Sequence, residues 1–505
     1  MCVPIPTIIV SAWLNHVPTK YSMFRACLHQ GVPLGCMLVP LVISSLNIAV
    51  AREGSLSDCL GFYLRAAIIL QLSTVLASIW WRVIFPYGYI CWTLSVVAVT
   101  YGIEIATFKT SAQSVVCMLV IILLYVAVAL LMLQGLPGSF TAGEAIVVAT
   151  GLSLVFFDTS IVTLANYILG SQFNVIGMPT FLVASRSQFV LLLETVISWL
   201  LLLITMYAPG GIKARMSEDV ASKRKWSLYF YEFACGAGIP LLVVWLSLVL
   251  KMNALYWGVL FVQSKQHKAA LVFSWVCCIV IALRVVSWRK NRSSNDNEEF
   301  MPIIVVRKLF HFIASAVFVT GLLGDVTLLH VSCTAALTIF ILIEVVRSCR
   351  LWPIGETLHY YMSCLTDSRD SGHVILTHIY LLVGLALPIW LVPSTRKGPF
   401  KLAMYAGVLS LGVGDSFASI FGKWLGRRKW PNSTKSLEGT LACMMGQIVA
   451  AGIVCSLDSQ IVLENTMQAI RIVVSLVLGS LLEGMTVQID NLVLPLYTLA
   501  LLLVH

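Results

Sequence analysis

Charged side chains are scarce in this sequence. Only 11% of its 505 residues are Asp, Glu, Lys or Arg, whereas 59% are hydrophobic, and the mean hydropathy is +0.91. Because roughly a quarter of the residues of a soluble domain are charged, this composition excludes a soluble globule. It predicts an all-α, polytopic integral membrane protein.

Signatures of several functional classes are also missing. No two cysteines have the CxxC spacing of a zinc or redox site, and most cysteines lie inside apolar runs, where cysteine behaves as a small hydrophobe. Alternating basic and aromatic stretches are absent, so no nucleic-acid partner is expected. Neither a GxxxxGK[ST] phosphate loop nor the motif set of protein kinases occurs.

Long apolar runs are what the sequence has in abundance. Runs of about 20 residues, long enough to cross a bilayer core of about 30 Å, recur from end to end, and we expect about 15 transmembrane helices. Those before the middle of the chain cover residues 31–50, 63–81, 85–106, 112–134, 144–168, 182–207, 228–250 and 268–287, and more follow residue 301.

One polar segment interrupts this pattern. Residues 289–302, RKNRSSNDNEEFMP, have few hydrophobic side chains and end in proline. They predict a linker between an N-terminal multi-span membrane region, residues 1–288, and a C-terminal membrane-embedded domain, residues 303–505.

The C-terminal part contains an apolar helix that is interrupted by two glycines and a carboxylate. Gly412 and Gly414 bracket Val413 directly before Asp415, and a helical continuation places Asp415, Ser419 and Lys423 four residues apart on one face. Ionisable groups inside or at the ends of spanning helices are costly and commonly functional. Asp415, and Glu438 at the start of the next apolar run, are therefore candidate site residues.

A basic loop, Gly422 to Lys435, connects these two helices, since Pro431 forbids a continuous helix. Ser436 stands where an N-cap belongs, so the free N–H groups of the following helix point at the loop and favour an anion. The alternative is that the loop only signals the cytosolic side of the membrane. The basic residues are Lys423, Arg427, Arg428, Lys429 and Lys435.

Pairing consecutive spans as hairpins brings the polar clusters after residue 301 to one membrane face. That face receives the basic loop, residues 367–373 and residues 488–491, together with most of the lysines and arginines of this part. The positive-inside rule makes it cytosolic. Arg307, Glu344 and Arg347 also lie there and are expected to hold helices together as ion pairs.

A basic loop, a helix N-terminus and several carboxylates suit a nucleoside triphosphate with Mg²⁺ or another divalent cation. Because the carboxylates are expected at the bilayer surface, the acceptor hydroxyl is expected to belong to a lipid. The residues alone therefore indicate a lipid-modifying enzyme that uses an activated phosphate.

Four segments carry a closer resemblance. VRKLFHF, DSRDSGHVILTHIY, GVGDSFASIFGKWLGRRKWPNSTKSLEGT and LLEGMTVQIDNLVLPLY occur in this order from about residue 301 onward. Together they resemble the dolichol kinase family, within the CTP-dependent polyprenol and phytol kinases. The resemblance implies transfer of the γ-phosphate of CTP to the terminal hydroxyl of dolichol in the endoplasmic reticulum membrane. The products would be CDP and dolichyl phosphate for protein N-glycosylation.

The residues and the resemblance, taken together, suggest roles for individual site residues. We expect Lys423, Arg428 and Lys435 to contact the triphosphate, and Asp415 and Glu438 to bind Mg²⁺. For the catalytic base, Asp490 is the first choice and Asp370 the second, beside Asp415 as a catalytic residue. The implied CTP-binding loop consists of Gly422, Lys423, Trp424, Leu425, Gly426, Arg427, Arg428, Lys429, Trp430, Pro431, Asn432, Ser433, Thr434, Lys435, Ser436 and Leu437.

Two other function classes stay open from the sequence. A CTP:phosphatidate cytidylyltransferase would use the same nucleotide but would release pyrophosphate and form a CDP-lipid. A polytopic transporter is suggested by the number of spans, although it would place its functional groups near the bilayer midplane. The expected partners are dolichol, CTP and membrane lipids, and the sequence does not predict an oligomeric state.

Overall fold

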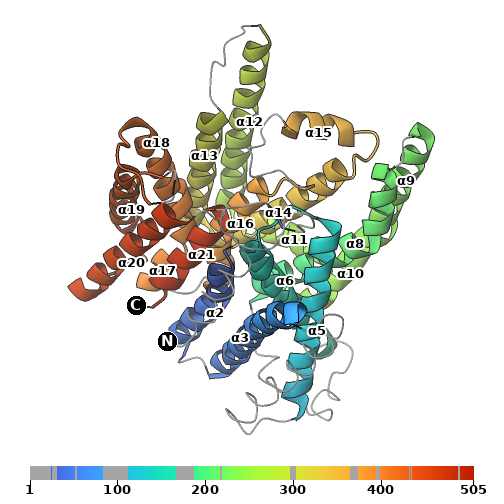
Figure 1. Cartoon of the computed structure of the whole chain (residues 1–505), viewed down its shortest axis with the longest axis horizontal. Helices are drawn as coiled ribbons and strands as arrows, with labels where there is room; N and C mark the ends of the chain where they lie inside the picture. The colour runs from blue at the N-terminus through green and yellow to red at the C-terminus, as the bar shows by residue number, and fades with distance from the viewer. Residues whose placement is uncertain are drawn as a thin grey trace. The chain divides into compact units, whose positions relative to one another are not determined.

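A computed structural model gives the architecture of the chain (Figure 1). It describes residues 24–25, 31–51, 54–83, 112–165, 187–216, 219–295, 303–363, 373–393, 398–431, 433, 435–486 and 490–504. Within these residues the regular structure is helical, and the one β-bridge joins Lys429 to Ser436. The predicted all-α class is confirmed.

Contacts divide the chain into two compact units. Unit 1 comprises Met1–Ala254 and Phe340–Leu376, and unit 2 comprises Leu255–Ile339 and Thr377–His505. The predicted linker does not coincide with this division, because a helix, α12 (Gln266–Asn295), continues through its first seven residues. Residues 296–302 lie outside the described residues. The predicted division into functional domains stays a prediction.

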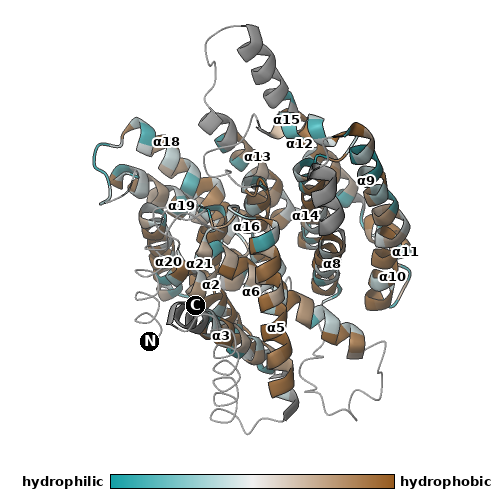
Figure 2. Cartoon of the chain, turned by 45° about the vertical axis from the view of Figure 1, so that its right-hand side comes forward, coloured by the Kyte–Doolittle hydropathy of each residue, from teal (hydrophilic) through white to brown (hydrophobic). Residues whose placement is uncertain are grey.

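Unit 1 is built mainly from long apolar helices that pack side by side. Its described helices are α2 (Val32–Ala49), α3 (Gly54–Val83), α5 (Ala112–Gly135), α6 (Ala142–Thr163), α8 (Gln188–Met216), α9 (Val220–Phe233), the π-helical turn η4 (Ala234–Gly238), α10 (Ile239–Leu250), α15 (Gly355–Ser363) and the second half of α14 (Val326–Ser348). Helix α6 packs against α2, α5 and α8. In Figure 2, α5 and α10 are brown along most of their length.

Helix α6 of unit 1 begins with a complete capping box. The Thr141 hydroxyl accepts a hydrogen bond from Glu144 N at 3.4 Å, and the Glu144 carboxylate accepts one from Thr141 N at 3.1 Å. Glu144 also pairs with Arg25 at 2.6 Å. A buried carboxylate in this unit is thus satisfied by the helix end and by one cation.

Unit 2 packs its helices around a buried π-helical segment. Its described elements are α11 (Ala254–Gln263), α12, α13 (Ile303–Gly324), the first half of α14, α16 (Thr377–Leu391), α17 (Pro399–Ala403), η6 (Val408–Asp415), α18 (Ser416–Trp424), α19 (Leu437–Leu457), α20 (Thr466–Met485) and α21 (Asp490–Leu502). Helices α13, α19 and α21 all contact η6.

The sequence explains why η6 can lie at the centre of unit 2. It reads VLSLGVGD, and a side chain at Gly414 would place its Cβ 2.5 Å from Gln447 Nε2 on α19. Glycine therefore lets the two backbones approach. Single π-helical turns within helices are frequent at functional sites, and this one ends at Asp415.

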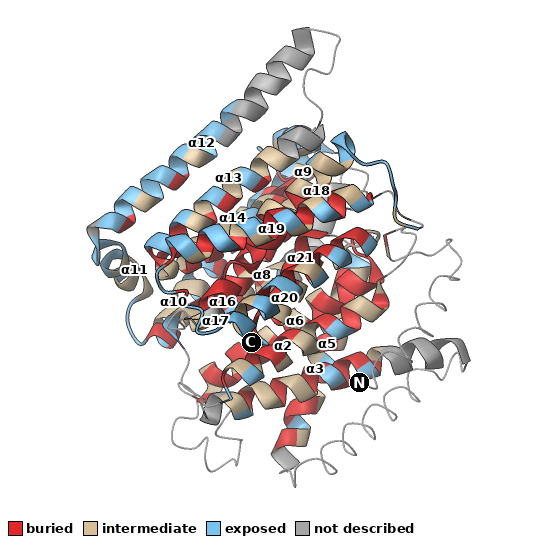
Figure 3. Cartoon of the chain, turned by 90° about the vertical axis from the view of Figure 1, so that its left-hand side faces the viewer, coloured by how far each residue is buried: buried red, intermediate tan, exposed pale blue. Residues whose placement is uncertain are grey.

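Eight of the described helices are long and apolar enough to cross a membrane, and five shorter apolar helices accompany them. The polytopic prediction is confirmed, although the expected span at 85–106 lies outside the described residues. On α19, Leu441, Met445, Val449 and Ile453 are all more than half exposed at intervals of four residues (Figure 3). This stripe is the surface that a helix presents to lipid.

Candidate active site

Asp415, predicted to be central, ends η6 and is buried at 7% exposure. Its carboxylate accepts a hydrogen bond from Lys308 Nζ at 2.5 Å, and its backbone carbonyl lies 3.3 Å from the same ammonium. His311 Nε2 is 3.5 Å from the carboxylate. Lys308 and His311 both come from α13, where a spacing of three residues puts them on one face.

Lys435, at the end of the basic loop, reaches two further carboxylates. Its ammonium lies 2.9 Å from Glu483 Oε1 and 3.2 Å from both carboxylate oxygens of Asp490, and it donates to the Glu483 backbone carbonyl at 2.6 Å. Burial opposes the charged form of this lysine, but Asp490 and Glu483 outweigh burial and raise the pKa of Lys435. Lys435 therefore stays protonated at neutral pH.

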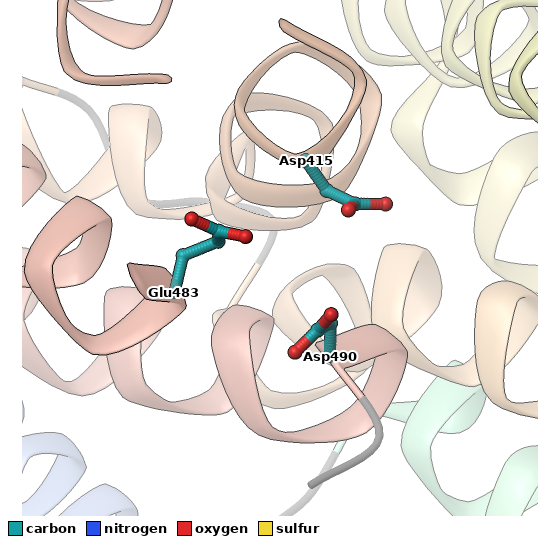
Figure 4. Close-up of side chains that lie close together, drawn as sticks. All are labelled: Asp415, Glu483 and Asp490. Atoms are coloured by element: carbon teal, nitrogen blue, oxygen red, sulfur yellow. The ribbon is translucent and has the colours of Figure 1, made fainter. Parts of the chain in front are cut away.

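Three buried carboxylates thus come together, which we call the carboxylate cluster: Asp415, Glu483 and Asp490. One oxygen of each lies within 4.8 Å of the others. They come from three elements, the end of η6, the last turn of α20 and the first residue of α21 (Figure 4). Carboxylate oxygens are the ligands that Mg²⁺ prefers, so these residues fit a divalent cation.

Glu438 was predicted to share a metal with Asp415, but the structure gives it other partners. Both of its carboxylate oxygens accept the backbone N–H of Arg428, at 3.1 and 3.2 Å. It lies outside the carboxylate cluster. Its position in the first turn of α19 explains this, because that turn lies against the returning loop.

The basic loop is a folded hairpin. Leu437 N donates to Arg428 O at 2.8 Å and Trp430 N donates to Lys435 O at 3.0 Å, which brackets the bridge between Lys429 and Ser436. As predicted, Ser436 caps α19, because its hydroxyl accepts Gly439 N at 3.1 Å.

Trp430 ties the loop to the helices. Its indole N–H donates to Thr440 Oγ1 at 3.0 Å on α19. On α20, a Cβ at Gly484 would lie 2.6 Å from both of these atoms, so the tryptophan fits because residue 484 has no side chain. Gly484 directly follows Glu483, and the loop is therefore fixed beside the carboxylate cluster.

The remaining predicted loop residues fall into three groups. Gly422 and Ser433 are half-buried. Asn432 and Thr434, like the alternative base Asp370, lie outside the described residues. The residues Lys423, Trp424, Leu425, Gly426, Arg427, Arg428, Lys429 and Pro431 are exposed. The loop, which is coloured teal for hydrophilic residues over part of its length in Figure 2, thus offers exposed cations beside a buried acidic centre.

The ion pair predicted from the spacing of Glu344 and Arg347 is confirmed in unit 1. Arg347 donates to the two carboxylate oxygens of Glu344 at 2.5 and 2.8 Å and to His373 O at 2.9 Å. Glu344 also accepts Ile375 N at 2.6 Å. The pair holds the chain just before α16, which is the structural role expected for it. The side chain of Arg307 lies outside the described residues.

Three residues at the site, Lys308, His311 and Glu483, were not among the site residues predicted from the sequence. The spacing of Lys308 and His311 was a usable signal for the first two. Glu483 carried no such signal, because the packing of α20 against α21 and η6 brings it to Asp415.

Similarity to known proteins identifies the family of the chain. A family model described as dolichol kinase matches residues 66–428. The dolichol kinase of Bos taurus is 35% identical over 410 residues, which cover 79% of this chain and 72% of the relative. That of Homo sapiens is 34% identical with the same coverage. The chain belongs to the dolichol kinase family.

A less similar relative is also a dolichol kinase. Dolichol kinase EVAN of Arabidopsis thaliana is 29% identical over 378 residues, covering 72% of this chain and 65% of the relative. No solved structure matches. The range that matches the dolichol kinase model contains Lys308, His311 and Asp415 but ends before Lys435. Only part of the candidate site therefore lies within the matched range.

Proposed function

We propose that this chain is a CTP-dependent dolichol kinase, which transfers the γ-phosphate of CTP to the terminal hydroxyl of dolichol. The observation that carries the proposal is the carboxylate cluster beside the folded basic loop, in a chain of the dolichol kinase family. Phosphoryl transfer needs little covalent help from the protein. Positioning and charge neutralisation dominate, and both are available here.

The basic loop would bind the triphosphate. Lys423 and Arg428 are exposed, and Lys435 stands between the loop and the carboxylate cluster. The backbone N–H groups in the first turn of α19 add a favourable field for an anion. Since the loop is fixed by Trp430 and Ser436, its cations need little reordering before they meet the nucleotide.

A divalent cation would be held by Asp415 and Glu483, with Asp490 as the third carboxylate of the cluster. When bound, such an ion offsets the negative charge of the transferring phosphoryl group. Lys435, which now neutralises Glu483 and Asp490, would then be available to the triphosphate. This replaces the earlier expectation that Glu438 is a ligand.

The transfer itself balances without a further reactant. The hydroxyl oxygen of dolichol forms a bond to the γ-phosphorus, the bond between that phosphorus and the β,γ-bridging oxygen breaks, and CDP leaves. The hydroxyl proton passes to a carboxylate, for which Asp490 remains the proposed acceptor.

The location follows from the same features. The exposed basic residues of the loop favour a cytosolic face, where CTP would be available. We propose a multi-pass protein of the endoplasmic reticulum membrane with its active site facing the cytosol, which would supply dolichyl phosphate for protein N-glycosylation.

The test uses membranes containing the protein, dolichol, and either γ-labelled CTP or γ-labelled ATP. The expected result is a labelled lipid phosphate from CTP, which is lost when the divalent cation is chelated and in the Asp415→Asn variant. Labelled pyrophosphate in place of labelled lipid would overturn the proposal in favour of a CDP-lipid synthase.

A further inference from the structure

One buried polar atom near the carboxylate cluster has no hydrogen-bond partner among the residues that the structure describes. Gln447, on α19, is 2% exposed, and its amide donates from Nε2 to Cys443 Sγ at 3.1 Å and to Ser480 Oγ at 3.2 Å. Its other amide atom, Oε1, is buried without a hydrogen bond. A buried acceptor without a donor is costly, more so where bilayer replaces water.

The place of Gln447 relates it to the site. Its Nε2 lies against Gly414, the residue before Asp415. Its partner Ser480 precedes Glu483 by one helical turn on α20. Gln447 is the eleventh residue of α19, about 15 Å along the axis from the start of that helix at the basic loop. On the proposed topology it therefore lies deeper than the loop, at the level of Gly414 and Ser480.

The outer faces of both helices around Gln447 are apolar and exposed. Met445 and Val449 on α19 and Leu478 and Leu481 on α20 are among these residues. In the membrane, these faces contact lipid, so a molecule that approaches the carboxylate cluster from the bilayer passes this level first. Gln447 lies on the opposite, inner side of α19 from Met445 and Val449, so a molecule that enters between α19 and α20 at this level would meet Gln447 before it meets the carboxylates.

We propose that Gln447 binds the hydroxyl of the long-chain isoprenoid alcohol and selects it from other membrane lipids. The inference rests on the proposed function, which supplies a substrate with an apolar chain and a single terminal hydroxyl. That hydroxyl donates one hydrogen bond, which Gln447 Oε1 lacks. A hydroxyl can also accept, so the pairing holds for either orientation of the amide.

Gln447 is a recognition residue in this scheme and takes no proton. The hydroxyl binds to the amide first, and its proton is later transferred to Asp490 after the oxygen has reached the phosphate. Loss of the amide should therefore raise KM for dolichol, while KM for CTP and kcat change little.

The experiment measures binding without nucleotide or divalent cation. Membranes containing the protein are labelled with a radioactive isoprenoid alcohol that carries a diazirine in its hydrocarbon tail. Unlabelled dolichol and dolichyl methyl ether are then compared as competitors that reduce this labelling. The ether has the same chain as dolichol but no hydroxyl hydrogen. In the wild type, dolichol should compete about tenfold better than the ether, the value of one buried hydrogen bond.

Two variants separate recognition from a structural role. Gln447→Met keeps the size of the side chain and should reduce the preference for alcohol over ether to about onefold, with a rise of about tenfold in KM for dolichol. Ser480→Ala removes the hydrogen bond that Gln447 Nε2 donates to α20 but leaves Oε1, and should keep the preference. Thermal unfolding in detergent verifies that both variants fold.

Three outcomes would overturn the proposal: equal competition by alcohol and ether in the wild type, an unchanged preference in Gln447→Met, or the same loss of preference in Ser480→Ala. An ordered water or a purely structural glutamine gives one of these. Failure of the kinase assignment is distinguishable, because it would abolish labelled phosphate while leaving the preference for the alcohol intact.

Discussion

Two groups of buried charges in this protein look alike in composition and differ in construction. In unit 1, Arg347 binds Glu344 through two nitrogens, and a backbone N–H, a backbone carbonyl and the His359 ring add further contacts. In unit 2, the three carboxylates of the cluster share the ammonium groups of Lys308 and Lys435. A planar guanidinium fixes one geometry, whereas an ammonium is a point charge that can exchange partners.

These two groups of charges show how a structural ion pair differs from a candidate site. The pair in unit 1 has one acid for one base, and both are held by the backbone. The carboxylate cluster has more acids than lysines, and one lysine spans two acids. An excess of negative charge on rigid helices is suited to an incoming cation, which the unit 1 pair has no capacity to bind.

The largest effect should follow a change in the carboxylate cluster. Asp415→Asn keeps the shape of the side chain but removes its charge, so transfer of phosphate to dolichol should fall by about 1,000-fold, or about 4 kcal/mol of transition-state stabilisation. The measurement is labelled dolichyl phosphate per folded protein. Activity within about tenfold of wild type would remove Asp415 from the site.

Breaking the unit 1 pair should act on stability instead. Arg347→Met leaves Glu344 buried without its cation, and the free energy of unfolding should fall by about 3 kcal/mol. Thermal unfolding in detergent measures the loss. The double variant Glu344→Gln with Arg347→Met should recover part of it, and the folded fraction of each should keep the wild-type KM for CTP. A changed KM would contradict a purely structural role.

A smaller effect should follow displacement of the basic loop. In Gly484→Ala the new Cβ would lie within 2.6 Å of the Trp430 indole nitrogen and Thr440 Oγ1. The loop should shift, and KM for CTP should rise about tenfold, the value of roughly one charge-assisted hydrogen bond. Gly452→Ala on α19 is the matched control, since a Cβ there meets nothing within 4 Å. Equal effects of the two changes would refute the role of Trp430.

The smallest effect is expected from replacing the helix caps, one in each unit. Thr141 caps α6 in unit 1 and Ser436 caps α19 in unit 2. Replacing either by Ala should cost about 1 kcal/mol of stability, measured by thermal unfolding. Only Ser436→Ala should also raise KM for CTP, because only that cap supports the basic loop. An unchanged KM would separate Ser436 from nucleotide binding.

Much of this arrangement could be predicted from the sequence because local rules decide it. Long apolar runs predicted the membrane helices, Ser436 the cap, and the spacing of Glu344 and Arg347 their ion pair. Asp415 was recognised because a carboxylate beside two glycines in an apolar helix is unusual.

Contacts between distant segments could not be read from the sequence. Glu438 was expected at the metal because it is close to Asp415 in sequence, whereas in the structure its carboxylate accepts the backbone N–H of Arg428. Glu483 replaces it only because α20 packs beside η6. The linker predicted from the polar composition of residues 289–302 stays a prediction, and its first residues continue α12 to Asn295, since no helix breaker precedes that point.

The position of Lys435 has a consequence for how the ligands of the site would depend on each other. Its ammonium now occupies Glu483 and Asp490, so a triphosphate that attracts Lys435 would leave both carboxylates more open to a cation. By thermodynamic linkage, a cation that displaces Lys435 would raise the affinity for the triphosphate by the same factor. A single side chain would thereby make nucleotide and metal binding cooperative.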